Sequence, residues 1–576
     1  MCGIVGICGK NRISVSELIK SLKRLEYRGY DSYGFVTDSG FLFRKVGEIS
    51  FSECFANEFN MAISHTRWAT HGKISEKNAH PHYDCNKNLF IVHNGIIENY
   101  LDLKNILEKK EHVFSSETDS EVIAHYFEDK LNEGKKIEQI IPIFFNDAKG
   151  TYAVLILCKN SNKIYAFKKD SPLVLGLVDN MNIIASDIFA FSDKTNKAIF
   201  FDDYEFAIID ANNYEFYNKN GEKINKNINT FEWCKDKLDK KFEHFMIKEI
   251  YEEPIVAERL LQSLRTTQKN KIEELKTMII NSKKIIFVAS GTSYHASLLG
   301  VYFLHKVGLE AQAIIASEFM DFANFDENTL VIAISQSGET MDVINALKIA
   351  KQKNAKIASI VNVPYSTVQR MSNLSIEILA GQEICVAATK SFVNQVILLL
   401  YLAKEFGLDV KLDKISDEIK LILKQENKIK KLAEELKNKN DIYIIGRGLS
   451  YPVAREIALK LKEISYIHAE GMMGGELKHG TLALIENGTP VIALINGNHH
   501  IVSNINEAMA RGAEIFAITN NGNVKYKKQI KIKTEHDGSF SILATIVGQL
   551  LTYYIARERG LPVDKPRNLA KSCTVL

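Results

Sequence analysis

The chain has 576 residues, too many for a single hydrophobic core, so several domains are expected. It carries 73 Lys and Arg against 70 Asp and Glu, a net charge of +3, which gives no electrostatic basis for binding nucleic acid or an acidic membrane surface. The longest apolar run, QVILLLYLA, is well short of the ~20 residues that a membrane-spanning helix needs. Neither nucleic acid nor a membrane is therefore expected as a partner.

The cysteines are scattered and form no C-x-x-C pair, which indicates neither a zinc site nor a disulfide framework. We expect no metal and no cofactor, and a reducing, cytoplasmic compartment. The N-terminus lacks a basic region followed by a small-residue cleavage site, so it does not match a secretory signal.

The chain opens with MCGIVGICGK, and Cys2 allows two interpretations. In the first interpretation, Cys2 is an ordinary small cysteine in a buried strand. Alternatively, Met1 is removed because the second residue is small, and Cys2 becomes an N-terminal nucleophile whose own α-amine acts as its base. The stretch alone leaves both open.

Three regions differ in pattern. Residues 1–228 contain runs such as LFIVHNGIIENY and TYAVLILCKN, which predict strands. Residues 229–275 are charged and contain no Gly or Pro before Pro254, which is typical of a linker running into a helix. From residue 276 short apolar runs alternate with helical stretches, a pattern that favours parallel sheets.

The last region repeats itself. IIFVASGTSY (285–294) matches IYIIGRGLSY (442–451), LVIAISQSG (330–338) matches PVIALINGN (490–498), and AKIASIVN (355–362) matches AEIFAITN (513–520). The common offset of roughly 160 residues predicts a duplicated domain.

Hydroxyl side chains gather at two predicted strand-to-helix turns of the first copy. Ser335, Ser337 and Thr340 lie in SQSGET, and Thr292 and Ser293 lie in SGTSYHA. Helix N-termini favour anions, and neighbouring parallel strands end at the same edge of a sheet. Capping by Ser and Thr would explain one such turn. Both together, without the lysine of a P-loop, predict a phosphate monoester site.

The second copy has INGNHH in place of SQSGET, so its anion site is expected to be lost. Its predicted helix instead places Glu456, Lys460 and Glu463 on one face. A solvated salt-bridge stripe is one interpretation. Apolar neighbours favour the other, a partly buried acid–base group that moves protons on a sugar. His479 is either an acid–base group or a surface histidine.

The tail DKPRNLAKSCTVL mixes apolar and polar residues, which suits a docked lid, although most polar tails are disordered. Lys571 within it could form an imine with a ketose if it were desolvated.

Motifs from the whole chain carry a resemblance to known families. CGIVGI, LEYRGYDSYG, SHTRWATHG, NAHPH, VHNGIIENY and SETDSEVI resemble the N-terminal-nucleophile glutamine amidotransferase domain. SGTSYHA, SQSGET, ALKLKEISYIHAE, GELKHG and DKPRNLAKSCTV resemble paired sugar isomerase (SIS) domains. In this order, over essentially the whole chain, they are similar to the isomerising glutamine:fructose-6-phosphate aminotransferases.

The resemblance implies an α+β and α/β multidomain fold, an αββα sandwich followed by two doubly wound, flavodoxin-like parallel-sheet domains. The expected boundaries are residues 2–228 for the glutaminase domain, 229–275 for a linker and helix, 276–413 and 437–566 for the SIS domains, and 567–576 for a catalytic tail. The implied reaction makes glucosamine 6-phosphate and glutamate from fructose 6-phosphate and glutamine. A homodimer is implied, because His479 would serve the neighbouring subunit's site.

The resemblance also implies roles in the glutamine site. Cys2 would attack the amide, and Asn94 and Gly95 would form the oxyanion hole. Asn-Gly is also typical of a tight hairpin turn, which would be compatible with this role. Arg67 would bind the glutamine carboxylate and Asp119 its α-amine. The pocket would be lined or covered by Trp68, Thr70, His71 and Arg28 with the loop after it.

In the sugar site, the phosphate would be held by Ser293, Ser335, Gln336, Ser337 and Thr340. Glu463 would move the C1/C2 proton, His479 would open the ring, and Lys571 would form the imine. Thr292, Glu456 and Lys460 would complete the site. Ser290 and Ala388 replace a cysteine and a serine that are usual in the family, without removing an acid, a base or a nucleophile.

Two other functions fit the same residues. One is a related amidotransferase, or a deaminase that uses free ammonia. The other is a non-catalytic sensor of sugar phosphates, although the chain has neither a helix-turn-helix pattern nor a basic face.

Overall fold

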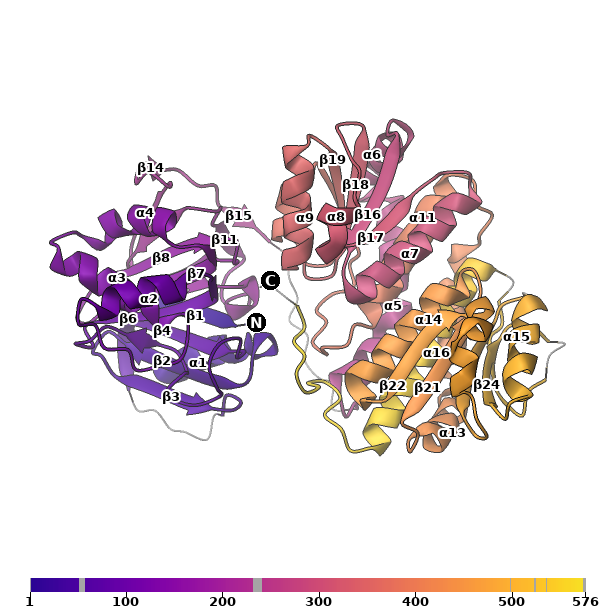
Figure 1. The fold of residues 1–576 in the computed structure, drawn as a ribbon. Coiled ribbons are helices and arrows are strands. Elements are labelled where there is room, and N and C mark those ends of the chain that lie inside the picture. The colour runs from indigo at the N-terminus through magenta and orange to yellow at the C-terminus, as the bar shows by residue number, and fades with distance from the viewer. Residues whose placement is uncertain are drawn as a thin grey trace. The chain divides into compact units, whose positions relative to one another are not determined.

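The computed structural model describes residues 2–50, 57–231, 241–497, 499–522, 525–534 and 536–572. These residues form two units, one built mainly from residues 2–231 and the other from residues 241–571 (Figure 1). Each unit is described by itself below.

The first unit contains an eight-stranded sheet in which every pairing is antiparallel. Its last strand lies just beyond residue 228, so this unit extends into the segment that the sequence assigns to the linker. In spatial order, the strands are β15 (Asn229–Thr230), β11 (Lys197–Phe200), β9 (Val174–Val178), β10 (Met181–Ala185), β1 (Gly3–Ser14), β4 (Glu58–Arg67), β2 (Ser32–Thr37) and β3 (Leu42–Val46).

A second antiparallel sheet has seven strands. Its strands, in spatial order, are β14 (Lys223–Ile224), β13 (Tyr214–Tyr217), β12 (Phe206–Ile209), β8 (Ile164–Lys169), β7 (Gly150–Cys158), β6 (Leu89–Ile97) and β5 (His82–Tyr83). The helices of this unit are α1 (Val15–Lys23), α2 (Tyr100–Glu108), α3 (Glu121–Asn132) and α4 (Ile137–Asp147).

The two sheets pack face to face because strand residues alternate between their faces. Ile63 of β4 and Val92 of β6 belong to the core between the sheets. Ile91, the neighbour of Val92, points to the other face, where α2, α3 and α4 cover it. Helix α1 packs against β1 and β4. The predicted αββα sandwich is confirmed, and its layers are visible in Figure 1.

The second unit contains two five-stranded sheets, and all their pairings are parallel. The first has the order β17 (Gln312–Ile315), β16 (Lys284–Ala289), β18 (Thr329–Ser335), β19 (Lys356–Val361) and β20 (Leu374–Glu377). The second has the order β22 (His468–Met473), β21 (Asp441–Gly446), β23 (Pro490–Ile495), β24 (Glu514–Thr519) and β25 (Lys528–Lys531). The same 2-1-3-4-5 order, typical of flavodoxin-like folds, confirms the predicted duplication.

Helices precede, connect and follow these strands. They are α5 (Phe245–Arg265), α6 (Lys269–Ile280), α7 (Gly291–Lys306), α8 (Phe319–Phe322), α9 (Met341–Gln352), α10 (Thr367–Met371), α11 (Lys390–Glu405), α12 (Ile415–Leu423), α13 (Glu426–Leu436), α14 (Ser450–Lys460), α15 (His499–Met509) and α16 (Asp537–Glu558).

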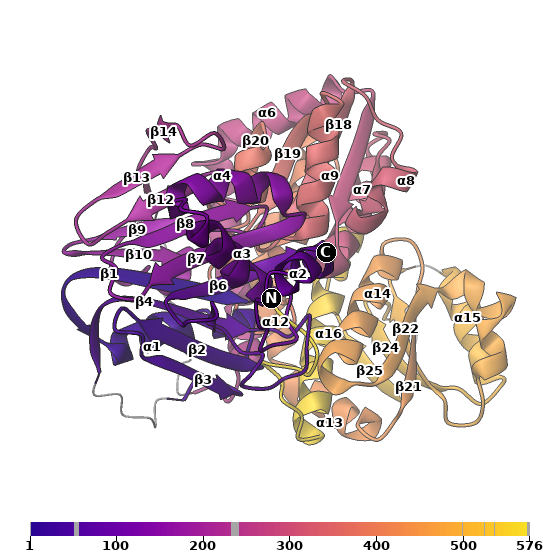
Figure 2. The ribbon, with the colours of Figure 1, turned by 60° about the vertical axis from the view of Figure 1, so that its left-hand side comes forward.

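Both parallel sheets are covered on their two faces. In β21, Ile444 faces the core that contains α14 and α16, and its neighbour Ile445 faces α15. Figure 2 shows α15 on one side of this sheet and α14 with α16 on the other. In β16, Phe287 and Val288 alternate in the same way between the α7 side and the α9 side. The doubly wound architecture is confirmed.

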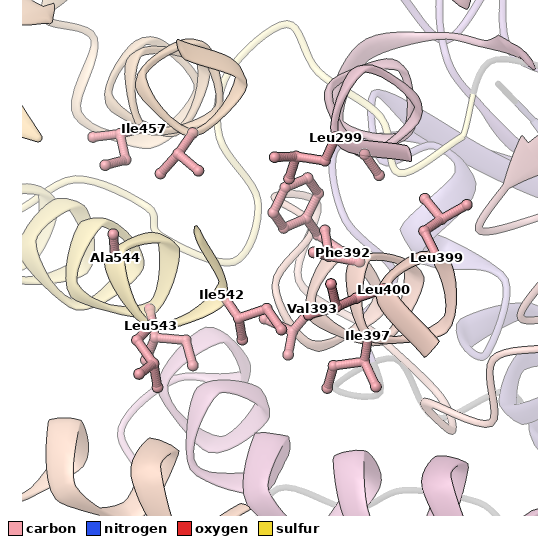
Figure 3. Close-up of a cluster of buried hydrophobic side chains, with 14 of the residues drawn as sticks. Leu299, Phe392, Val393, Ile397, Leu399, Leu400, Ile457, Ile542, Leu543 and Ala544 are labelled. Atoms are coloured by element: carbon pink, nitrogen blue, oxygen red, sulfur yellow. The ribbon is translucent and has the colours of Figure 1, made fainter. Parts of the chain in front are cut away.

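The two parallel-sheet domains share one hydrophobic core. Figure 3 shows Leu299 of α7, Phe392 of α11, Ile457 of α14 and Ile542 of α16 in the same cluster, and all four are buried. Because α7 and α14 meet across this core, their polar residues can also meet.

Helix α16 is long and apolar enough to cross a membrane, with a mean hydropathy of 1.4 over 18 residues. That window is completely buried inside the protein, as is typical of a core helix. Its apolar composition is explained by the shared core that it helps to form.

Candidate active sites

Cys2 lies at the start of β1, beside residues from both sheets of the sandwich. The backbone N–H of Trp68 donates to its Sγ at 3.3 Å, and Sγ lies 3.6 Å from the Trp68 carbonyl oxygen. From the other sheet, Nδ2 of Asn94 donates to the Cys2 carbonyl oxygen at 3.0 Å. The thiol, an amide donor and a backbone N–H are therefore neighbours. Met1, whose removal the sequence predicts, lies outside the described residues.

Asn94 and Gly95 lie inside β6, paired with Ala153 and Tyr152 of β7. The alternative of a tight hairpin turn is therefore wrong, because the pairing with β7 continues through both residues. Gly95 has φ +130°, and a Cβ there would lie 2.0 Å from the Thr151 carbonyl oxygen. Only glycine fits, and its backbone turns without leaving the sheet. The Asn94 amide and the adjacent Gly95 N–H are the donors that the family resemblance assigns to the oxyanion hole.

Arg67 ends β4 and is only 3% exposed. Its guanidinium donates to the carbonyl oxygens of His71, Gly72 and Lys73, which shape the turn after the strand. Burial lowers the pKa of Arg67, while the nearby Cys2, Asp31 and Asp119 act in the opposite direction. A buried cation thus lies close to the Cys2 thiol and to carboxylates.

Asp119 is buried just before α3. Its Oδ2 accepts the N–H of Ile97 at 2.8 Å, which ties the carboxylate to the end of β6. Together with Arg67 it supplies the opposite charges that the amine and carboxylate of an amino acid require.

The segment after Arg67 packs against the loop after Arg28. Trp68 meets Tyr30 edge-on, with ring centroids 5.6 Å apart, and the N–H of Ala69 donates to Asp31 at 2.8 Å. Neither Tyr30 nor Asp31 is singled out by its spacing in the sequence. Thr70 is exposed, and His71 is half-buried beside Tyr100, at a ring distance of 5.7 Å.

Arg28 itself is directed elsewhere. Its guanidinium donates to the Ser186 carbonyl oxygen at 2.8 Å and pairs with Asp187 at 3.3 Å. In this conformation it anchors the start of the loop, and the residues after it reach the Trp68 segment.

Four buried histidines support this site and are not distinguished by sequence spacing. Burial lowers the pKa of His65, His80, His82 and His93, so they are neutral near pH 7. His93 Nδ1 lies 2.8 Å from the hydroxyl of Ser120, next to Asp119. They form an uncharged polar layer between β4, β5, β6 and the start of α3.

In the second unit, the turn after β18 has the form of an anion site. The Ser335 hydroxyl accepts the N–H of Gly338 at 3.0 Å and lies 3.0 Å from the hydroxyl of Thr340, directly before α9. The Ser337 hydroxyl accepts the N–H of Glu339 at 3.1 Å. Gly338 has φ +64°, and a Cβ there would lie 2.0 Å from Ser366 Oγ. The first-turn N–H groups of α9 are aligned beside these hydroxyls.

Gln336 lies in the same turn, and its carbonyl oxygen accepts the N–H groups of Asn362 and Val363. Ser293 is on α7, which follows the adjacent strand β16, and its hydroxyl accepts a hydrogen bond from Gln395 at 3.0 Å. The position of Gln395 in the sequence gives no indication of this contact with Ser293.

Thr292 belongs to a different group from Ser293. Its hydroxyl donates to Glu456 at 3.1 Å and accepts from Lys460 Nζ at 3.0 Å. His295, which the sequence does not single out, lies 2.7 Å from the other Glu456 oxygen. Helix α7 of the first domain and α14 of the second thus build one site.

Glu456, Lys460 and Glu463 share a helix face, as their spacing predicts. Lys460 Nζ lies 3.3 Å from Glu456 and 2.5 Å from Glu463. The first two side chains are each 1% exposed and Glu463 is 19% exposed, so the interpretation as a solvated stripe is wrong.

The charges in this group influence one another. Burial opposes the charge of Lys460, but the two carboxylates outweigh burial and hold its pKa above the ordinary value. Burial likewise opposes the charge of Glu456, but Lys460 and His295 outweigh it and lower its pKa. Burial raises the pKa of Glu463, with partial compensation from Lys460. Glu463 is therefore the carboxyl that more readily accepts a proton.

Glu463 lies on a π-helical turn, Leu461–Ser465, that follows α14 and ends at Tyr466. Such turns place side chains out of the regular helical register and are frequent at functional sites. The N–H of Arg567 donates to the Tyr466 hydroxyl at 2.8 Å, so the C-terminal tail runs beside this turn.

Lys571 is docked and only 4% exposed. Its Nζ donates to Glu383 at 2.5 Å and to the Cys385 carbonyl oxygen at 2.8 Å. Burial opposes ionisation of Glu383, but Lys571 outweighs it and lowers the carboxyl pKa to about 2. Lys571 also acts electrostatically on Glu463. Glu383 is a partner that sequence spacing does not reveal, and residues 573–576 of the tail lie outside the described residues.

His479 has no contact with these residues among those that the structure records in the described part of the chain. It is exposed at the end of the 3-10 turn Gly474–His479. Ser290 occupies the N-cap position of α7, and Ala388 is half-buried before α11.

The comparisons with known proteins agree with this arrangement. A glutamine amidotransferase domain is matched over residues 65–193, and SIS domains are matched over residues 278–404 and 435–556. The chain is 42% identical to a glutamine–fructose-6-phosphate aminotransferase [isomerizing] from Thermococcus kodakarensis and 39% identical to one from Clostridium acetobutylicum, with 100% of both chains covered in each case.

A solved structure covers the second unit. The C-terminal domain of glucosamine-fructose-6-phosphate aminotransferase from Francisella tularensis aligns with a TM-score of 0.52 and 34% identity, over 57% of this chain and 100% of its own. The full-length similarity, with both kinds of domain in the same order, shows that the chain belongs to the family of isomerising glutamine–fructose-6-phosphate aminotransferases.

Proposed function

We propose that the protein synthesises D-glucosamine 6-phosphate and L-glutamate from D-fructose 6-phosphate and L-glutamine. The observation that carries this proposal is that one chain holds both a thiol beside amide donors, at Cys2, and a buried lysine near a proton-accepting carboxyl, at Lys571 and Glu463. The first group suits amide hydrolysis, and the second suits imine formation with proton transfer. The product would enter amino-sugar synthesis.

In the glutamine reaction, the Cys2 thiolate attacks the side-chain amide carbon, and the free α-amine of Cys2 takes the thiol proton. The Asn94 amide and the Gly95 N–H donate to the developing oxyanion, an interaction that typically contributes about 3–4 kcal/mol per donor. Arg67 and Asp119 hold the carboxylate and the α-amine. Ammonia leaves, and water then releases glutamate from the thioester.

In the sugar reaction, the turn that contains Ser335 and Thr340 binds the phosphate together with Ser293, Gln336 and Ser337. The amine of Lys571 condenses with the C2 carbonyl and releases water, and ammonia then displaces the lysine. Glu463 transfers a proton from C1 to C2, which converts the ketose imine to the amino aldose. Glu456, Lys460 and Thr292 hold Glu463 in place. Transfer of ammonia without release to water keeps it unprotonated.

We further propose a homodimer in which His479 of the partner subunit assists opening of the sugar ring. The exposure of His479 in its own chain supports this role. A cytoplasmic location and independence from any redox or group-transfer cofactor complete the proposal.

Substitution of Cys2 by alanine tests the assignment. Cys2→Ala should abolish synthesis with glutamine but retain synthesis with ammonium salts, because the sugar site is intact. The matched control is Cys158→Ala, a half-buried thiol at the end of β7 that should leave both activities unchanged. If Cys2→Ala works as well as the wild type with glutamine, the first unit is not the nitrogen source. The intact mass of the active protein should correspond to a chain without Met1. Retention of Met1 in active protein would exclude the α-amine of Cys2 as the base.

A further inference from the structure

Four side chains of metal-binding types converge in the first unit, outside the residues assigned to glutamine binding. They are Cys85, His112, His125 and Glu128, and their ligand atoms all lie within 4.8 Å of one another. Cys85 follows β5, His112 follows α2, and His125 and Glu128 lie one turn apart on α3. Three segments of the chain therefore supply one cluster.

The distances within the cluster match those between ligands of a tetrahedral ion. Cys85 Sγ lies 3.8 Å from His112 Nδ1 and 3.5 Å from His125 Nδ1. Glu128 Oε2 lies 2.9 Å from His112 Nδ1 and 3.2 Å from His125 Nδ1. Zinc bonds of about 2.0–2.3 Å in a tetrahedron place ligand atoms roughly 3.3–3.7 Å apart. The four distances lie within about half an ångström of this range.

The surroundings also suit a metal ion. His112, His125 and Glu128 are buried, while Cys85 is exposed and leaves a path for entry. The second ring nitrogen of each histidine faces a carboxylate. His125 Nε2 lies 3.7 Å from Glu121, and His112 Nε2 lies 3.9 Å from Asp129. Both separations are longer than a hydrogen bond, and His125 Nε2 has no hydrogen-bond partner among the described residues, but each carboxylate is placed where the outer shell of a metal site usually lies.

We propose that Cys85, His112, His125 and Glu128 bind a zinc ion. Four protein ligands with one thiolate and two imidazoles favour zinc over calcium or magnesium, which prefer oxygen ligands. A site filled by four protein ligands is structural rather than catalytic. The scattered cysteines predict no zinc site, and the cluster forms only because β5, α2 and α3 meet in the fold.

The ion would connect the β5–β6 turn to α3. The loop that leads into α3 carries Asp119, so the ion would stabilise the backbone on which the proposed glutamine site is built. The site itself does not depend on the proposed function, because metal content can be measured without any activity.

The test measures zinc in the full-length protein after exhaustive dialysis against metal-free buffer. We expect one zinc per wild-type chain by elemental analysis, and loss of this zinc in Cys85→Ser and in His112→Gln. Cys158→Ser, which removes a thiol from the same unit but outside the cluster, should retain the ion. A chelator should lower the melting temperature of the wild type and of Cys158→Ser, but not that of Cys85→Ser.

Cobalt provides a second readout that does not depend on the metal present after purification. Cobalt added to metal-free wild type should give the visible absorption of a tetrahedral ion and a thiolate charge-transfer band, and Cys85→Ser should lose that band. Absence of both zinc retention and a thiolate–cobalt band in the wild type would show that the cluster is only a hydrogen-bonded group. Equal zinc in the wild type and in both cluster variants would place the ion elsewhere.

Discussion

The two parallel-sheet domains of the second unit have the same strand order but opposite distributions of polar residues. When residues 285–294 are aligned with 442–451 and the alignment is extended along α7 and α14, Leu299 and Phe303 correspond to Glu456 and Lys460. At the helix start the relation is reversed, because Thr292 corresponds to Leu449. Each copy keeps polar residues where the other is apolar.

This complementarity explains why the two helices form one site. Thr292 and His295 from the start of α7 meet Glu456 and Lys460 from the later turns of α14. If α7 carried the same residues as α14, two sets of buried charged side chains would face each other without the hydroxyl and imidazole partners of α7. If α14 carried the same residues as α7, the buried charged side chains would be missing. Duplication therefore supplied a scaffold, and divergence placed the complementary polar residues of one cluster on its two halves.

The edges of the two sheets differ in the same way. Ser335 and Gln336 of the first copy correspond to Ile495 and Asn496 of the second. The first edge retains the hydroxyls of an anion site, whereas Asn496 accepts a hydrogen bond from Asn520 at 2.9 Å. Lys571, although it follows the second domain in the chain, docks on Glu383 of the first. Both observations support the proposal that the first copy binds the sugar phosphate.

Removal of Lys571 should have the largest effect. Lys571→Ala should reduce synthesis by at least about 10³-fold, as loss of a covalent group does, because no imine can form. Binding of fructose 6-phosphate, measured by calorimetry, should persist because the turn at Ser335 is unchanged. Unchanged turnover would contradict the imine, and lost binding would place the phosphate at the tail.

Lys460 should be the next most sensitive position. Lys460→Met leaves the buried Glu456 and the half-buried Glu463 without their cation. It should cost about 3–5 kcal/mol in the free energy of unfolding and should also abolish the sugar reaction. Denaturant unfolding and ammonia-dependent synthesis measure the two effects. The control is Lys306→Met on α7, where the lysine is 44% exposed, and its change should stay within about 0.5 kcal/mol. Similar losses of stability in both variants would show that the buried charges on α14 matter no more than an exposed lysine on α7.

Glu249 should make stability depend on pH. Burial, with Glu383 nearby, raises its pKa from 4.5 to about 8, so the folded state retains a proton that the unfolded state has lost. Stability should therefore fall as pH rises from about 4.5 to 8, at about 1.4 kcal/mol per pKa unit. Glu249→Gln keeps the acceptor for the Ile384 N–H and should remove this part of the decline. Denaturant unfolding between pH 4.5 and 8 measures the loss of stability in both proteins. An equal decline in Glu249→Gln and in the wild type would refute the role of Glu249.

The smallest effect tests the two sheet edges directly. Gln336→Ala should raise the KM for fructose 6-phosphate about tenfold, equivalent to about 1.4 kcal/mol, and leave the KM for glutamine unchanged. The matched variant Asn496→Ala in the second copy should change neither value. Steady-state kinetics with each substrate varied separately decides the result. An equal increase in both variants would mean that both edges contribute to binding.

Local patterns explain which features could be predicted. Hydroxyl-rich turns, the helix face of Glu456, Lys460 and Glu463, and the repeated strands depend on residues close together in the chain, where strand and helix periodicity determine geometry. The run LFIVHNGIIENY predicts a strand, but the pair Asn94-Gly95 within it is also typical of a hairpin turn. The pairing of β6 with β7 decided between them.

The sequence by itself determined the duplicated α/β architecture and the chemical types of the site residues, because strand and helix patterns and motif composition are local properties. The layered sandwich followed only from the resemblance to a known family. Only the tertiary structure decided that Thr292 meets Lys460, that Lys571 meets Glu383, and that Cys85 meets Glu128. These pairs come from segments far apart in the chain, and their contacts depend on how apolar faces pack rather than on any spacing along the chain.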